Sequence, residues 1–363
     1  VVMIVAAVTV IAVGMPRNEH NEMFTTYLDD SFEFRRANNH LNQELGGIHR
    51  LLYTLDSGKE NGIYEPIYLQ RVDAFAEWFR QQQGVSNVYT YTDIMKRLNR
   101  AMHNNNPQDY TLPQSKELAA QYALVHEMSL SEGQELTNMV SMDKRKTMLT
   151  VIVAETDSKN LLALNKQAEE WLKKNTSPEM QTKGVGLDLI FSNMAMTNIP
   201  SMVYGTFLCM AIVSLMLGFA LKSWRFGVIS VFTNAVPVAV ALGLWGFING
   251  RIDIGVAAVG TLSFGIVVDD TIHFMTHYQK FKQAGMQTVD AIREVFVSSG
   301  LAMITTTVAL IGGFGILSFS HYSANANMGF LTAICMLLAI LFDLLALPAW
   351  LVWRDTKNDT IKQ

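Results

Sequence analysis

The stretch GTLSFGIVVDDTIHFMTHY, residues 260–278, decides the fold class, because it sets two adjacent carboxylates inside an apolar run. Residues 254–268, ahead of the acids, include no charged side chain. A helix of that length rises about 22 Å at ~1.5 Å per residue, whereas the hydrocarbon core of a bilayer is about 30 Å thick. We therefore expect Asp269 and Asp270 to lie inside the membrane, where charge is rare and usually functional.

Charge is distributed unevenly along the chain. The 363 residues are 50% hydrophobic and only 17% charged, against about 25% charged in ordinary soluble domains. Residues 15–202 contain 19 Lys/Arg and 24 Asp/Glu, whereas residues 203–363 contain 9 and 8. This pattern predicts a soluble domain joined to a membrane domain, and it excludes a cytosolic enzyme, a disordered protein and a nucleic-acid binder. Cys209 and Cys335 lie in apolar runs, so we expect no disulfide framework.

Apolar runs predict the membrane helices, because backbone amides in hydrocarbon must be paired within their own segment. Residues 1–14 are wholly apolar but shorter than the roughly 20 residues that a spanning helix needs. We expect them to be the end of a transmembrane helix that starts before the chain does. The longer runs are Tyr204–Leu221, Phe226–Ile248, Ile254–Met275, Val297–Leu317 and Met328–Trp353.

The loops between these runs predict the orientation. One side has only Arg251, and the other has eight basic residues: Lys222, Arg225, Lys280, Lys282, Arg293, Arg354, Lys357 and Lys362. The apolar runs give a five-helix domain at residues 203–355, followed by a tail at 356–363. By the positive-inside rule, the tail is cytoplasmic and residues 15–202 lie on the opposite side of the membrane. Within the helix domain, residues 284–297 have the spacing of an amphipathic helix on the cytoplasmic surface, or are a solvated connector.

The polar region 15–202 has an α/β pattern. Strand-like segments cover 50–55, 85–91, 146–154 and 180–185, and helical patterns cover 64–83 and the residues after Asp157 or Ser158. They form two βαβ units on either side of a mostly helical insertion at about 93–143. This order predicts a ferredoxin-like, split βαβ sheet.

The acid pair and its neighbours are the candidate site. His273 follows Asp269 by four residues and Asp270 by three, so it can lie beside either carboxylate on a helix. Two carboxylates and an imidazole can take up and release protons, and we interpret them as a proton relay. Adjacent positions lie about 100° apart on a helix, and we expect Asp269 to matter at least as much as Asp270, because it shares a face with Gly265 and His273.

A third intramembrane acid, Asp343, has no basic residue within reach in its own run. It either takes part in coupling or accepts a hydrogen bond from a Ser or Thr of a neighbouring helix. The run that follows the acid pair supplies hydroxyls, and Thr305 and Thr306 are the predicted coupling partners. No Walker-type phosphate loop, HExxH motif or clustered His and Cys ligands occur in the sequence. We therefore expect no cofactor, no metal and no ATP drive of its own.

These residues resemble a known family. One helix, a large polar domain and five further helices is the order of one half of a resistance-nodulation-division (RND) transporter. GTLSFGIVVDDTIHF is similar to the fourth- and tenth-helix motif of the MMPL-type, hydrophobe-exporting branch. Three more segments match: LKSWRFGVISVFTNAVPV, SSGLAMITTTVALIGGFGILSFS and LLAILFDLLALPAWLV, so that the resemblance covers nearly all of 203–353. Many members have an Asp–Tyr pair where this chain has Asp269 and Asp270 followed by Thr271.

The resemblance implies a proton-driven exporter of lipids or other hydrophobic or amphiphilic molecules. Residues 1–14 would end the seventh of twelve helices, and 15–202 would be a periplasmic porter domain. The protein would lie in a bacterial inner membrane and need the missing N-terminal half of the same protein. A homo-oligomer or a periplasmic partner would be possible. Two alternatives stay open: a protein-translocation accessory of the SecD/SecF type, and a Patched-like module that senses sterols or lipids without transport.

Overall fold

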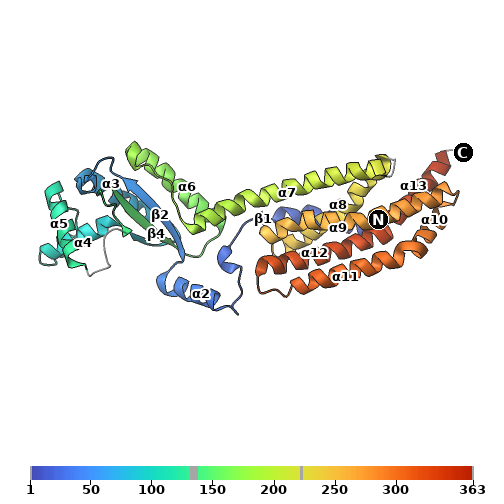
Figure 1. Cartoon of the computed structure of the whole chain (residues 1–363), viewed down its shortest axis with the longest axis horizontal. Coiled ribbons are helices and arrows are strands. Elements are labelled where there is room, and N and C mark those ends of the chain that lie inside the picture. The colour runs from blue at the N-terminus through green and yellow to red at the C-terminus, as the bar shows by residue number, and fades with distance from the viewer. Residues whose placement is uncertain (1, 131–137, 221–223, 362–363) are drawn as a thin grey trace. The chain divides into compact units, whose positions relative to one another are not determined.

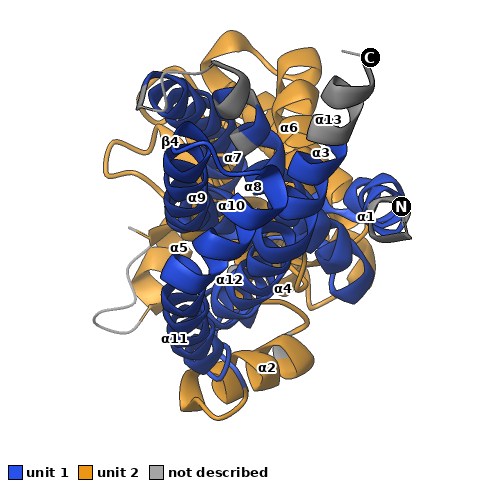
Figure 2. Ribbon diagram, turned by 90° about the vertical axis from the view of Figure 1, so that its right-hand side faces the viewer, with its two compact units in different colours: residues 1–22, 26–29, 195–363 blue, residues 23–25, 30–194 orange. Residues whose placement is uncertain are grey.

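The computed structural model describes residues 2–130, 138–220 and 224–361, and Figure 1 shows their helices and strands. The chain divides into two compact units, coloured separately in Figure 2. Unit 1 comprises residues 1–22, 26–29 and 195–363, and unit 2 comprises residues 23–25 and 30–194. Lys222 and Lys362, two of the eight basic residues on which the predicted orientation rests, lie outside the described residues.

Unit 2 is built on a three-stranded sheet in the order β2-β4-β3. The strands are β2 (His49–Asp56), β3 (Val85–Tyr89) and β4 (Lys146–Val153), and β4 runs antiparallel to both neighbours. Every second residue of β4 is buried, which is the alternation expected of a sheet with one face against a core. The buried face therefore belongs to Leu149, Val151 and Val153 of the central strand.

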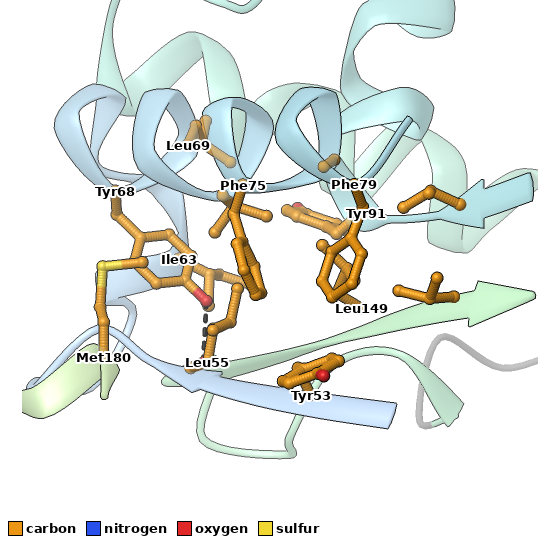
Figure 3. Packing of buried hydrophobic residues seen from close by; sticks show 14 of the residues in the cluster. Tyr53, Leu55, Ile63, Tyr68, Leu69, Phe75, Phe79, Tyr91, Leu149 and Met180 are labelled. Atoms are coloured by element: carbon orange, nitrogen blue, oxygen red, sulfur yellow. Dashed lines mark hydrogen bonds between the residues drawn. The ribbon is translucent and has the colours of Figure 1, made fainter. Parts of the chain in front are cut away.

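Helices complete the core of unit 2. The helix α3 (Pro66–Arg80) connects β2 to β3, and α6 (Ser158–Asn175) follows β4. Figure 3 shows Tyr68, Phe75 and Phe79 of α3 pointing toward the strands, where the Tyr68 hydroxyl donates to the Leu55 carbonyl over 2.9 Å. The Asp157 side chain accepts from the backbone N–H of Asn160, which confirms the predicted cap of α6. The remaining helices are α2 (Glu33–Leu45), α4 (Tyr91–Met102) and α5 (Lys116–Ser129).

The fourth strand expected at 180–185 is reduced to a single bridge. Val185 exchanges two backbone hydrogen bonds with Leu52, of 2.8 and 2.9 Å, beside β2. A 3-10 turn occupies Pro178–Met180, and the helix α7 (Leu187–Ala220) begins two residues after the bridge. The segment therefore has too little extended chain for a ladder.

Unit 1 is helical. Among the described residues, five helices are long and apolar enough to cross a membrane, as the sequence predicts. Their candidate spans are Leu187–Phe219, Val231–Ile248, Ile254–Gln283, Thr288–Leu317 and Ser323–Arg354. The first of these starts well before the predicted Tyr204, because α7 is continuous from Leu187, and the boundary between the units falls at residues 194–195 instead of 202. The N-terminal apolar residues form the shorter helix α1 (Val2–Gly14).

Close backbone contacts join some of these helices. The helix α12 (Ser323–Leu341) packs against α8 (Trp224–Ile248), α9 (Ile254–Gln283) and α11 (Leu301–Leu317), and α1 packs against α8. A Cβ atom at Gly14 or at Gly246 would lie 2.0 Å from a carbonyl oxygen of the facing helix. Those two positions therefore require glycine.

The start of α9 is fixed by side chains. The Asp253 carboxylate caps the helix by accepting from Val256 N at 2.8 Å, and it also accepts from Asn327 Nδ2 at 2.6 Å. Glu22, only 1% exposed, accepts from Ile254 N. Burial, which outweighs these hydrogen bonds, raises the pKa of Asp253. Carboxylates at a helix N-terminus also interact favourably with the helix dipole, so the helix with the acid pair is held firmly at this end.

Two π-helical turns interrupt the later helices. The predicted amphipathic helix at 284–297 begins only at Thr288, because Gly285 has a φ of +90° and ends the preceding helix. This helix, α10 (Thr288–Val295), continues through a π-helical turn at Phe296–Gly300 into α11. A second π-helical turn at Phe342–Ala346 joins α12 to α13 (Leu347–Ile361) and contains Asp343. Such turns are rare in proteins overall, but those that occur are often found at functional sites.

Candidate functional site

The acid pair of α9 is divided between two environments. The exposed fraction of the Asp269 side chain is 74% within this chain, whereas Asp270 is half-buried and the next residue, Thr271, is fully buried. Successive residues of a helix point about 100° apart. The helix therefore presents one carboxylate outward and directs Asp270 and Thr271 toward its neighbours.

The inner part of the site is centred on the Thr271 hydroxyl. It lies 2.9 Å from Asn234 Oδ1 on α8, and 3.1 and 3.3 Å from the two carboxylate oxygens of Asp343. Asp343 is 1% exposed, and Asn234 is fully buried. Three segments far apart in the chain thus place a carboxylate, a hydroxyl and an amide within hydrogen-bond distance, inside the predicted membrane region.

Asp270 has its own hydroxyl partner. Its Oδ2 accepts from the Thr307 hydroxyl of α11 at 3.0 Å, and the same hydroxyl lies 2.9 Å from the carbonyl of Met303. Thr307 is 3% exposed. The two inner carboxylates therefore share one arrangement, in which a threonine hydroxyl stands between the carboxylate and a neutral oxygen.

The outer part of the site contains Asp269 and His273. The His273 Nε2 lies 3.7 Å from Asp269 Oδ1, at the predicted spacing of four residues, and the exposed fraction of the histidine side chain is 61%. Gly265 is on the same exposed face, and a Cβ added there would meet nothing within 4 Å. The expected shared face of these three residues is present, and this chain leaves it uncovered.

The predicted coupling partners Thr305 and Thr306 do not contact the acids. Their hydroxyls donate to the carbonyls of Leu301 and Ala302 in their own helix, and both side chains are exposed. Consecutive threonines point in different directions, and the one that faces α9 is Thr307. Thr307 lies four residues after Met303, which is also buried, but no sequence signal distinguishes it from its two neighbours.

The structure adds a histidine that the sequence interpretation had left out. His277, one further turn along α9 from His273, has its Nδ1 3.1 Å from Ser299 Oγ and 3.3 Å from Ser298 Oγ. Both serines belong to the π-helical turn before α11. A row of Asp269, His273 and His277 at intervals of four residues therefore runs toward the end of α9. In the described part of the chain, no group of three or more His, Cys, Asp or Glu residues could hold a metal ion.

Comparisons with known proteins agree with this architecture. A crystal structure of a heavy metal efflux pump superposes with a TM-score of 0.52 at 17% identity, covering 92% of this chain and 38% of the pump. A Methanocaldococcus jannaschii protein named as a membrane protein is 29% identical over 124 residues, which is 33% of this chain and 32% of that protein. This chain thus spans well under half of the length of the pump and of the Methanocaldococcus jannaschii protein. The fold of this chain is similar to that of part of the efflux pump.

Such a fold, with five candidate spans and acids between packed helices, is that of a multi-pass membrane protein. The model of the MMPL family matches residues 72–355, most of unit 2 and nearly all of unit 1. The chain belongs to the MMPL family.

Proposed function

We propose that this chain is part of a transporter that uses inward proton flow to export lipids or other hydrophobic or amphiphilic molecules. One observation carries the proposal: Asp343 and Asp270, in helices that cross the membrane, are each held by a threonine hydroxyl. A charged side chain at the centre of a bilayer costs about 2.5–3.5 kcal/mol on insertion scales. Protonation removes that charge, so it can shift the balance between two arrangements of the helices.

The hydroxyls give this shift a structural form. A threonine hydroxyl has one proton to donate, yet Thr271 lies within hydrogen-bond distance of both Asp343 and Asn234. When Asp343 is ionised, the Thr271 proton points to the carboxylate. When Asp343 is protonated, it donates to the Thr271 oxygen, and Thr271 turns its own proton to Asn234. Thr307 makes the corresponding choice between Asp270 and the Met303 carbonyl.

The outward pair indicates a partner. Asp269 and His273 are too polar to face lipid, so we infer that this face of α9 is covered in the assembled transporter by a homologous half or by a second copy of this chain. Asp269 and His273 would then pass protons between the covered interface and the end of α9. The basic residues near that end favour a cytoplasmic location, with unit 2 as the periplasmic porter domain. The sheet has the order β2-β4-β3, and the Val185 bridge pairs with the outer side of β2, as a fourth strand would. This order supports a split βαβ fold.

Unit 2 offers a candidate cargo site. A cavity of about 680 Å³ lies against the sheet face opposite α3. Apolar side chains, among them Leu41, Ile94 and Ile152, line it together with two arginines and one acid, Arg50, Arg97 and Asp93. Ligand pockets commonly combine apolar walls with a few polar groups that fix orientation. This lining suits an amphiphile with an acidic headgroup.

Transport by the assembled protein in proteoliposomes tests the proposal. With an imposed pH gradient, we expect efflux of a fluorescent amphiphile, and we expect Asp343→Asn to abolish it while protein insertion is unchanged. The exposed Asp290→Asn on α10 is the matched control and should transport normally. Proton-independent transport, or movement of small hydrophilic ions alone, would refute the proposal.

A further inference from the structure

An apolar groove lies between α10 and α13, away from the acids. Its volume is about 410 Å³, and its lining is entirely apolar: Val289, Ile292, Pro348, Ala349, Val352 and Trp353. Ile292 and Pro348 form a buried floor, while Val289 and Trp353 are 63% and 61% exposed at the rim. An enclosed apolar cavity of roughly 150 Å³ already accepts a benzene-sized molecule. This groove therefore has room for a stretch of hydrocarbon chain.

The position of the groove identifies what surrounds it. The uncharged stretch 344–353 ends at Trp353, which lines the groove, and Arg354 is the first charged residue after it. Tryptophan is enriched at the boundary between hydrocarbon and headgroups. Beside it, the guanidinium of Arg354 lies 5.5 Å from the ring centroid of Trp350. The groove thus lies at the end of the uncharged stretch of α13, and the cationic Arg354 is the next residue along the helix.

We propose that this groove binds one acyl chain of an anionic phospholipid from the surrounding leaflet, with the phosphate beside Arg354. The headgroup is placed on the α13 side because Arg354, which precedes Asp355, directly follows the lining residue Trp353, whereas α10 has two acids, Asp290 and Glu294, next to its single Arg293. Anionic lipids are attracted to basic residues at the membrane surface by about 1 kcal/mol for each Lys or Arg. The ligand is a membrane lipid held at a fixed place, distinct from any cargo in unit 2.

Both walls of the groove lead to the inner acids through π-helical turns. The α10 wall continues through Phe296–Gly300 into α11, which contains Thr307. The α13 wall follows directly on Phe342–Ala346, which contains Asp343. A bound chain that bridges the two walls therefore restrains both segments that hold the relay. This second consequence rests on the proposed function, whereas lipid binding does not.

Photo-crosslinking tests the binding. The assembled protein is placed in nanodiscs that contain phosphatidylglycerol with a diazirine on one acyl chain, and labelled peptides are identified by mass spectrometry. We expect labelling concentrated at residues 289–292 and 348–353. Ala349→Phe, which fills the groove, should reduce it at least about 5-fold. Val308→Phe, at a lipid-facing position of α11 that is 62% exposed, should leave it unchanged.

Headgroup choice is measured in the same assay. Unlabelled phosphatidylglycerol should compete several-fold better than phosphatidylcholine, and Arg354→Gln should remove that preference. Labelling spread evenly over all apolar helix surfaces, or labelling that survives Ala349→Phe, would overturn the proposal. If Ala349→Phe lowers the melting temperature of the protein, Val289→Trp is used in its place, because it fills the same groove from the exposed rim.

Coupling to the relay has a separate readout. Transport should depend on the phosphatidylglycerol content of the liposomes, and Ala349→Phe should make it independent of that content. Asp343→Asn should retain the crosslink although transport is lost. Failure of transport altogether therefore counts against the proposed function, while an absent crosslink counts against the groove.

Discussion

The two units differ in the side chains that they expose. Unit 2 has a core of aromatic and aliphatic residues, such as Tyr53, Phe75 and Phe79, beneath a charged surface. Unit 1 exposes large apolar residues, such as Phe207 and Val308, on its helices. Its buried polar residues lie between the helices and include Asn234, Thr271 and Asp343. Each unit thus matches its own solvent, and a buried polar residue in the membrane part marks the functional interior.

Asp269 and His273 depart from this pattern. They lie in the membrane part but are exposed within this chain. In unit 2 an exposed acid would be unremarkable, since charged residues there belong at the surface. In unit 1 we interpret the same exposure as a surface that another protein segment is proposed to cover. The comparison therefore distinguishes exposed residues that water solvates from exposed residues that a partner is proposed to cover, and the following experiments test it.

The largest effect is expected at the acid pair. Replacing both Asp269 and Asp270 with Asn preserves size and hydrogen bonding but removes the protons that the pair exchanges. We expect transport by the assembled protein to fall more than about 100-fold, the scale associated with losing a proton-transfer group. Expression and membrane insertion should be unchanged, as for the control Asp290→Asn. Proton-dependent transport that persists in the double variant would leave these acids with a structural role only.

A core substitution should separate the units next. Residues 30–194 expressed alone should give a soluble α/β domain by circular dichroism. Phe75→Ala should lower its free energy of unfolding by about 3–5 kcal/mol, because a fully buried aromatic ring is replaced by a cavity. The exposed Ile67→Ala, at 73% exposure on the same helix, should change it by less than about 0.5 kcal/mol. A disordered isolated unit would contradict the division into two cores.

The inner hydroxyls give a smaller effect with a matched control. Thr307→Val removes the donor to Asp270 and keeps the shape of the side chain. A hydrogen bond to a charged group contributes about 1.5–3 kcal/mol, so we expect transport to fall roughly 10-fold and its pH profile to shift. Thr305→Val, two residues away and bonded only to Leu301 O, should change neither. Equal effects of the two variants would remove Thr307 from the relay.

How far the sequence predicts this molecule depends on the physical constraint involved. The five spans were predictable because hydrocarbon requires long uncharged helices, and the acids were recognisable as exceptions to that rule. Periodicity also indicated β2, β3 and β4. The missing length of the fourth strand could not be foreseen, because α7 continues back to Leu187 through Pro200, a residue type that usually ends a helix.

The contacts of the site were less predictable than its acids. Which of three consecutive threonines meets Asp270 depends on the rotation of α11, and the π-helical turn at Phe296–Gly300 changes that rotation without a clear sequence signal. The meeting of Asp343 with Thr271 likewise needs a π-helical turn and a neighbouring helix. The residue types that do the chemistry can therefore be read from the sequence, but their pairing cannot.

The smallest expected effect is an acid dependence of unit 2 alone. Asp56 lies 2.7 Å from Arg145 Nε, and although burial acts to raise the pKa of Asp56, the hydrogen bonds from Arg145 and from Gly58 N lower it overall. A carboxyl with a depressed folded pKa stabilises the fold above its unfolded pKa of about 3.9 and loses that contribution as the pH falls further.

Asp56→Asn should therefore reduce stability by about 0.5–1 kcal/mol at neutral pH, the scale of a partly exposed ion pair. The free energy of unfolding of Asp56→Asn should also fall less steeply below about pH 4, because position 56 then has no carboxyl to protonate. Urea denaturation of residues 30–194 across pH 3–7 measures both quantities, with the exposed Glu60→Gln as the control. If the free energy of unfolding fell as steeply at acid pH in Asp56→Asn as in the unmodified domain, the ion pair would not be the source of that fall.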